Sequence, residues 1–258
     1  MRNRLLQLAV GTLVLLCVAT AAGYFGMRVG RSFQVNQMCC QITQRHNFAI
    51  SVKERLGLLK FPSQIGQDRW VGEKVFPGVT DGYFLDVGSA DGFINSNTWA
   101  LEQRGWKGIC VDPFPSNMQQ RTCQMFQEAV DAEGGNKVQF ALAGELGGIS
   151  NYLDRYKDAL KGSKTVELTT VTLGNILQRA NAPSFIHFMS LDIEGAELEA
   201  LRGFPFDRYK LGAMAIEHNY EEPKRSEIQE FLKGKGYLRA HTWLQDDFYL
   251  PTPPLAKR

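Results

Sequence analysis

The 258-residue sequence lacks the features that mark several specialised classes of protein. It has no large charge excess: 29 Lys and Arg stand against 27 Asp and Glu, and a net charge of +2 argues against a nucleic-acid partner. It also has no internal repeat and no low-complexity tract. Hydrophobic residues make up 44% and charged residues 22%, which excludes a disordered, collagenous or coiled-coil chain. The length suits one sizeable α/β domain, or two small ones, with a hydrophobic core.

Cysteine is scarce and shows no pairing pattern. The count of five is odd, and no two cysteines form a C-x-x-C pair. Cys39 and Cys40 are adjacent, whereas Cys17, Cys110 and Cys123 are scattered. We therefore expect neither a disulfide scaffold nor a structural zinc site, and a reducing compartment fits this usage.

Charge is absent from residues 5–27, which are rich in Leu, Val and Ala. As a helix this run would extend ~34 Å, enough to cross the ~30 Å hydrocarbon core of a membrane. We predict an uncleaved single-pass membrane anchor within residues 1–30. A cleaved signal peptide with Ala19-Thr20-Ala21 at its cleavage site is the main alternative, and a buried or transit helix is another.

Residues 31–65 read as a juxtamembrane connector, with a short helix at 50–59. Arginines flank the apolar run almost equally on both sides, so the positive-inside rule does not set its orientation. Residues 66–258 form the main domain.

The main domain alternates apolar runs with helical segments. The expected strands are 83–88, 107–111, 137–143, 167–171, 185–191, 211–217, 237–243 and 247–250. The expected helices are 95–104, 118–132, 172–180, 196–202 and 224–235. This alternation predicts a doubly wound α/β fold, with a mostly parallel sheet covered by helices on both faces. The close spacing of the last two strands predicts one antiparallel strand at the end.

Ligands of such sheets bind beyond the carboxyl ends of the strands. The first strand ends in DVGSADG, in which Gly88 and Gly92 allow a tight turn and a close backbone approach. The spacing is not G-x-G-x-x-G, which argues against a nicotinamide oxidoreductase. The carboxylate of Asp86 suits a cofactor with a cationic amino-acid end, such as S-adenosylmethionine. A glycine turn without any ligand is the purely structural interpretation.

The second strand ends at Asp112, 24 residues after Gly88. An acid at this place can accept both ribose hydroxyls of an adenosine cofactor. A turn-forming role before Pro113 is the alternative interpretation.

Two later strand ends carry the candidate catalytic groups Asp192, Glu194, Glu217 and His218. This set can abstract a proton or hold a divalent metal that lowers the pKa of a hydroxyl group. The sequence does not decide between a metal and a metal-free site. Glu197 suits a simple helix-capping role.

The motifs DVGSADGF, VTL, SLDIEGAELEALRGF, AIEHN and DDFYL resemble the FkbM family of S-adenosylmethionine-dependent methyltransferases. The resemblance covers residues 64–250, and LDIEGAE placed one strand before IEHN is its most specific element. It implies a seven-stranded class I methyltransferase-like Rossmann fold. One departure is Gly174-Asn175, where the family often has two acids; we expect this position to open a helix.

The resemblance also implies roles for individual residues. The first loop would hold the methionine end of the cofactor, Asp112 the ribose, and Leu142 and Ala143 the adenine. Asp192 and Glu194 would lie near the acceptor and the transferred methyl group. The residues implied in the first loop are Asp86, Gly88, Ser89, Ala90, Asp91 and Gly92.

The resemblance implies O-methylation of a hydroxyl group on a sugar or another small molecule. With a membrane anchor, a lipid-linked acceptor becomes an attractive hypothesis. Because S-adenosylmethionine is made in the cytosol, we expect the catalytic domain to face the cytosol. The alternative is a non-catalytic, membrane-anchored interaction protein on the same fold.

Overall fold

The structure is a computed structural model that describes residues 61–153 and 157–254. The predicted anchor, at residues 1–30, and the predicted helix at 50–59 lie outside the described residues. Among the residues described, no helix combines the length and the apolar character needed to cross a bilayer.

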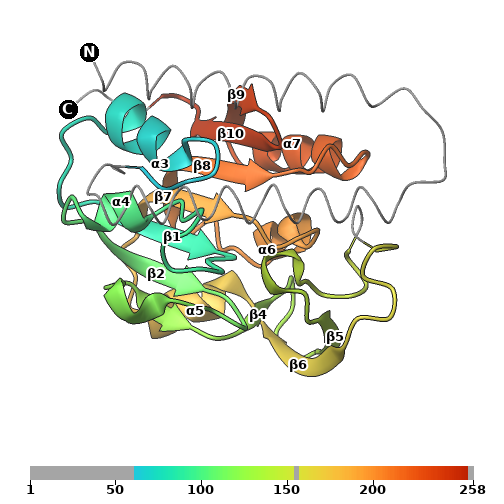
Figure 1. The fold of residues 1–258 in the computed structure, drawn as a ribbon. Helices are drawn as coiled ribbons and strands as arrows, with labels where there is room; N and C mark the ends of the chain where they lie inside the picture. The colour runs from blue at the N-terminus through green and yellow to red at the C-terminus, as the bar shows by residue number, and fades with distance from the viewer. Residues whose placement is uncertain (1–60, 154–156, 255–258) are drawn as a thin grey trace, which may run out of the picture. The chain divides into compact units, whose positions relative to one another are not determined.

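A seven-stranded sheet with the order β3-β2-β1-β7-β8-β10-β9 forms the centre of the domain (Figure 1). Its strands are β1 Tyr83–Val87, β2 Lys107–Val111, β3 Gln124–Phe126, β7 Phe185–Leu191, β8 Lys210–Glu217, β9 Tyr237–Trp243 and β10 Asp246–Pro251. The neighbours from β3 to β8 pair in parallel, while β10 is antiparallel to both β8 and β9. This confirms the prediction of a mostly parallel, doubly wound sheet that ends with an antiparallel strand.

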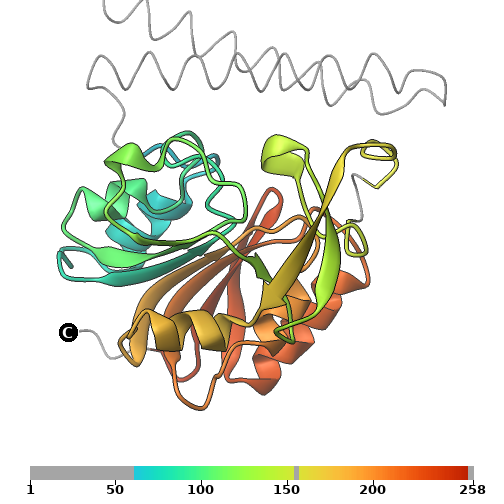
Figure 2. The ribbon, with the colours of Figure 1, turned by 90° about the horizontal axis from the view of Figure 1, so that it is seen from below.

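Helices cover both faces of this sheet (Figure 2). One face packs against α5 Leu173–Arg179, α6 Glu197–Arg202 and α7 Lys224–Gly234; the other packs against α3 Gln67–Trp70, the π-helix η1 Val71–Val75 and α4 Trp99–Glu102. Because side chains alternate along a strand, Leu85 and Val87 of β1 enter the first core, and Phe84 enters the second beside Trp106. The central strands are therefore buried on both sides.

A second, three-stranded sheet stands beside the first. It consists of β4 Ala129–Val130, β5 Lys137–Ala141 and β6 Thr165–Val171, in the order β4-β6-β5. The predicted strand at 137–143 is thus real but belongs to this sheet, because β5 pairs antiparallel with β6. A 3-10 turn, η3 Gly144–Leu146, follows β5.

The predicted helix at 118–132 is wrong. The segment contains a 3-10 turn, η2 Met118–Gln120, and then β3 and β4. Strand β3 extends the main sheet, with Ile109 opposite Gln124 and Val111 opposite Phe126. Pairing with the neighbouring strand has overridden the local helical preference.

The predicted helix at 95–104 is shortened to α4, a single turn. The Ser96 hydroxyl accepts a hydrogen bond from the backbone N–H of Trp99 at 3.1 Å. The helices predicted at 172–180, 196–202 and 224–235 are confirmed as α5, α6 and α7. Gly174-Asn175 does open α5, since the Thr172 side chain accepts from the Asn175 backbone N–H.

No disulfide scaffold was expected from the sequence, and the one disulfide that the described residues contain was not predicted. Cys110 of β2 and Cys123 form a disulfide, with Cα atoms 5.8 Å apart. The two lie 13 residues apart in the chain and become neighbours only because β3 lies beside β2.

Candidate cofactor and acceptor site

A pocket of about 610 Å³ lies beyond the carboxyl ends of β1, β2, β7 and β8. Strand order reverses between β1 and β7, the place where ligands of doubly wound sheets bind. All the predicted site residues except Gly92 and His218 line the pocket. Those that do are Asp86, Gly88, Ser89, Ala90, Asp91, Asp112, Leu142, Ala143, Asp192, Glu194 and Glu217.

The two predicted glycines are needed by the packing of the loop itself. Gly88 has φ +85°, and a Cβ atom there would lie 1.6 Å from the backbone oxygen of Asp192. A Cβ atom at Gly92 would lie 2.5 Å from the backbone oxygen of Asn117. No side chain fits at either position, so the end of β1 can approach the end of β7 at Gly88, and the loop can approach the backbone of Asn117 at Gly92.

Asp86 and Ser89 bring polar atoms to the bottom of the pocket. The buried Asp86 carboxylate accepts a hydrogen bond from the Thr98 hydroxyl at 2.5 Å. Burial raises the pKa of Asp86, and the positive charge of Arg121 opposes that rise. Within the described part of the chain, the buried hydroxyl oxygen of Ser89 and amide oxygen of Asn97 have no hydrogen-bond partner. Both residues line the pocket, so a ligand could satisfy these atoms.

The Asp91 carboxylate is used by the loop that carries it. It accepts hydrogen bonds from the backbone N–H groups of Phe93 at 3.0 Å and Ile94 at 2.8 Å, and from the Ser116 hydroxyl at 3.1 Å. Asp91 therefore shapes the wall of the pocket through these contacts.

Asp112 lies at the end of β2, as predicted. Its two carboxylate oxygens accept from the backbone N–H groups of Ala90 at 3.0 Å and Phe114 at 2.7 Å. Burial raises its pKa, and these two hydrogen bonds oppose that rise. Each oxygen keeps a lone pair for a hydroxyl donor. Leu142 and Ala143, just after β5, also line the pocket.

Three carboxyl groups gather where β7 and β8 end. Oxygens of Asp192, Glu194 and Glu217 lie within 4.8 Å of one another. The Asn219 amide donates to Glu217 at 2.5 Å and to Glu194 at 3.4 Å. Hard oxygen donors of this kind can hold a divalent cation or share a proton.

Burial sets the protonation of this group. Burial, together with the charge of Asp246, raises the pKa of Asp192 to about 7. The pKa of Glu217 is also raised, first by burial and then by the Asp192 charge. Both residues form a side-chain hydrogen bond with each other, so we treat them as one pair that retains a proton near neutral pH.

Backbone strain coincides with the same corner. Glu194, Asn219 and Tyr220 have φ values of 55°, 45° and 62°, a region that non-glycine residues rarely adopt. Such conformations persist where surrounding contacts enforce them, and they are common at binding sites.

His218 lies apart from the pocket lining, contrary to its predicted catalytic placement. Its Nδ1 accepts the Tyr220 backbone N–H at 2.9 Å, and its Nε2 lies 3.8 Å from Asp247. Burial lowers its pKa, so the ring is neutral near pH 7. A residue that follows a strand end can turn to either side of the sheet, and the sequence does not indicate which.

Sequence reasoning missed the amide side chains of the pocket. Gln64, Gln67, Asn97 and Gln245 all line it, and they come from segments with no strand-end motif. Loop amides carry no periodic signal, so only the folded chain brings them to the site.

Comparison with known proteins identifies the family. The methyltransferase FkbM domain family matches residues 86–239, more than half of the chain. No curated protein is similar enough to count as a match. A solved structure from Pyrococcus horikoshii, provisionally described as an RNA methyltransferase, is 11% identical, with a TM-score of 0.36. The alignment covers 72% of this chain and 84% of that one, a likeness too distant to bear on function. Methyltransferases in general use S-adenosylmethionine, and this chain belongs to the FkbM methyltransferase domain family.

Proposed function

We propose that this methyltransferase transfers a methyl group from S-adenosylmethionine to a hydroxyl group of a neutral small molecule. One observation carries the proposal: a single pocket joins the acids at the ends of β1 and β2 to the carboxyl pair at the ends of β7 and β8. The acids at the ends of β1 and β2 suit a nucleoside cofactor, and the carboxyl pair at the ends of β7 and β8 can accept a proton.

The chain's own residues fit the cofactor. Asp86 and the hydroxyl of Ser89, which has no hydrogen-bond partner among the described residues, would hold its amino-acid end, and Asp112 its ribose hydroxyls. Leu142 and Ala143 would form an apolar wall for the adenine. The glycine turn at Gly88 would let backbone approach the ligand.

When bound, the cofactor supplies an activated methyl group together with its leaving group. The protein then has to position the acceptor, which can contribute ~7–11 kcal/mol, and to remove the hydroxyl proton. Asp192 is the proposed base, because a pKa of about 7 lets it accept a proton near neutral pH. Glu217, protonated, would donate a hydrogen bond that holds Asp192 in place. Glu194 would contact the acceptor.

The charge of the pocket supports a neutral acceptor. Among the described residues, no Lys, Arg or His lines it, whereas eight acidic residues do: Asp86, Asp91, Asp112, Glu128, Glu145, Asp192, Glu194 and Glu217. A phosphate or carboxylate on the acceptor would lie among like charges without a cation to pair with. A hydroxyl-rich molecule such as a sugar instead matches the carboxylates and loop amides.

Residues 5–27 support membrane attachment, and with it a lipid-linked acceptor whose neutral part enters the pocket. Cofactor supply favours a cytosolic catalytic domain. The Cys110–Cys123 disulfide is the opposing observation, because disulfides persist mainly in oxidising compartments.

Calorimetric titration of the full-length chain with S-adenosylhomocysteine tests the cofactor assignment. We expect micromolar binding that Asp112→Ala abolishes and that Glu230→Ala, on the exposed surface of α7, leaves unchanged. A folded protein that does not bind would favour the alternative, a non-catalytic interaction protein.

A metal requirement is a separate question about the same pocket. Methyl transfer that survives exhaustive chelation would support a proton-accepting role for Asp192 without a metal. Activity that chelation removes and Mg²⁺ restores would instead make the three carboxylates cation ligands.

A further inference from the structure

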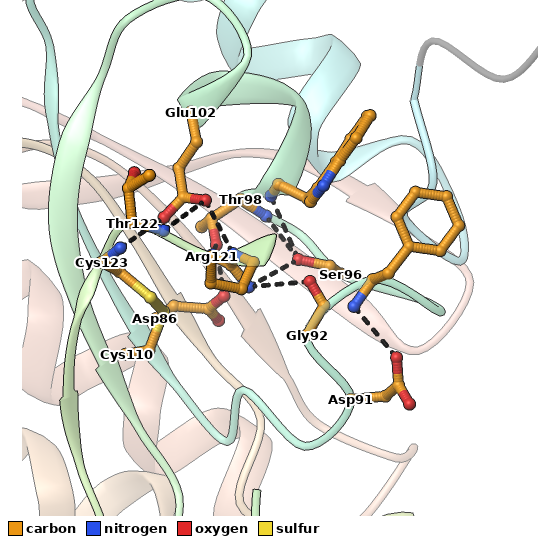
Figure 3. Close-up of polar contacts among 12 residues, drawn as sticks. Asp86, Asp91, Gly92, Ser96, Thr98, Glu102, Cys110, Arg121, Thr122 and Cys123 are labelled. Atoms are coloured by element: carbon orange, nitrogen blue, oxygen red, sulfur yellow. Dashed lines mark hydrogen bonds and ion pairs between the residues drawn. A yellow bond between two sulfur atoms is a disulfide. The ribbon is translucent and has the colours of Figure 1, made fainter. Parts of the chain in front are cut away.

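A buried cluster centred on Arg121 contacts residues that line the pocket (Figure 3). Arg121 and Glu102 form an ion pair with Nε and Oε2 2.9 Å apart, and each side chain is 1% exposed. Arg121 also donates to the Thr98 hydroxyl at 2.7 Å, and Thr98 donates in turn to Asp86 at 2.5 Å. The guanidinium is thus one residue away from a pocket carboxylate.

The same guanidinium holds the loop that follows β1. Its Nη1 donates to the backbone oxygen of Gly92 and to the hydroxyl of Ser96, both at 3.2 Å. This loop supplies Ser96, Asn97 and other residues to the pocket wall. Arg121 therefore contacts the loop at three points, Gly92, Ser96 and Thr98, although it does not line the pocket itself.

Glu102, the ion-pair partner of Arg121, is itself held by hydrogen bonds from residues at one end of a disulfide. The Glu102 carboxylate accepts from the backbone N–H groups of Thr122 at 3.3 Å and Cys123 at 2.8 Å. Cys123 is joined to Cys110 of β2 by the disulfide. Helix α4, strand β2 and residues 121–123 thus form one connected support for the guanidinium.

We propose that Arg121 is a positioning residue for the cofactor: it orients the Asp86 carboxylate through Thr98 and holds the loop 91–98 in its pocket-forming shape. The inference rests on the proposed function. A buried ion pair contributes little net stability compared with apolar residues of similar size, so its main effect is expected on the geometry of the loop. The Arg121 charge also keeps the pKa of the buried Asp86 lower than burial alone would leave it.

The test compares affinity with stability in the full-length chain. S-adenosylhomocysteine is titrated calorimetrically into the wild type, Arg121→Ala, Arg121→Lys and Thr98→Val, and each protein is also unfolded by heat. Arg225→Ala is the matched control, because Arg225 forms an analogous pair with the buried Asp247 at 2.8 Å, outside the pocket lining.

Arg121→Ala is expected to weaken binding about 10- to 100-fold, by analogy with the loss of an outer partner of a metal-ligating side chain. Arg121→Lys should recover part of the affinity, because it keeps the charge but loses the planar fork. Thr98→Val, nearly the same in shape, should also weaken binding. Arg225→Ala should lower the Tm and leave the affinity at the wild-type value.

An Arg121→Ala protein that binds like the wild type while its Tm falls would overturn the inference and leave Arg121 a purely structural residue. If this variant does not fold, Thr98→Val decides: wild-type affinity in that variant would also overturn it. A wild type that does not bind S-adenosylhomocysteine would refute the proposed function itself, and the inference with it.

Discussion

At the scale of single residues, burial rather than residue type gives Asp192 and Glu217 their chemistry. Two carboxyl groups this close in a buried site cannot both be ionised, so one retains its proton near neutral pH. An exposed Asp of ordinary pKa would be too weak a base for a hydroxyl group. The pocket therefore gains a proton acceptor from two residues that are individually unremarkable in the sequence.

Asp192 should also make the stability of the protein depend on pH. Its pKa rises from 3.8 in the unfolded chain to about 7 in the folded protein, so the folded state binds more protons between these values. The contribution of Asp192 to stability should fall as the pH rises from about 4 to 7 and level off above, by a few kcal/mol at most. Thermal unfolding between pH 5 and 8 should show a flatter dependence for Asp192→Asn. Asp207→Asn, on the exposed surface, is the control, and equal slopes in both variants would contradict the assignment.

Gly88 offers a second prediction at this scale. Gly88→Ala combines a positive φ with a Cβ atom 1.6 Å from the Asp192 backbone, and it should cost about 4 kcal/mol or more. Gly135→Ala has a similar φ of +89° but open space around its Cβ, so it should cost only the strain, about 1–2 kcal/mol. Denaturant unfolding of both variants separates the two effects. Equal losses would mean that the loop can move away from β7.

At the scale of elements, the segment between β2 and β5 departs most from expectation. Instead of forming the predicted helix, its parts pair with strands elsewhere: β3 pairs with β2, and β4 pairs with β6. The Arg121 ion pair and the disulfide lie at the start of β3. The segment therefore connects the edge of the main sheet, through Arg121, to the loop 91–98.

Reduction of the disulfide should therefore affect cofactor binding. Opening the Cys110–Cys123 bond frees residues 121–123, so we expect weaker binding of S-adenosylhomocysteine after treatment with a phosphine reductant. Cys123→Ser should bind equally with and without the reductant. If mass spectrometry confirms free thiols in the wild type and the affinity is unchanged, the disulfide has no part in holding Arg121.

At the scale of the whole molecule, the predicted anchor gives a testable expectation for the location of the protein. Residues 5–27 should keep the full-length chain in the membrane fraction after an alkaline carbonate wash, and detergent should release it. Release by carbonate alone would contradict a spanning anchor. Replacing Leu15 and Leu16 with Asp should let carbonate alone release the chain, because charge within the membrane is costly.

Protease treatment of sealed membranes decides the orientation of the catalytic domain. Cofactor supply predicts digestion of the domain without detergent. Protection would contradict this and agree with the disulfide, since it would place the domain in an oxidising lumen. The Asp112→Ala variant, which changes cofactor binding but not targeting, should give the same digestion pattern as the wild type.

The positions of four main strands in the chain, and the acids at their ends, could be predicted from the sequence alone. Buried parallel strands are continuous apolar runs, so residues 83–88, 107–111, 185–191 and 211–217 were recognisable without any contact information. Asp86, Asp112, Asp192 and Glu217 followed from the rule that ligands bind where such strands end.

The other features depend on residues that are distant in the chain and meet only in the folded protein. The position of β3, the disulfide and the Arg121 network all arise from segments that meet when β2 and β3 pair. The side to which His218 turns and the shared proton of Asp192 and Glu217 depend on burial, which is a property of the assembled fold. Local propensity contains no term for such contacts, so a single sequence could not predict them.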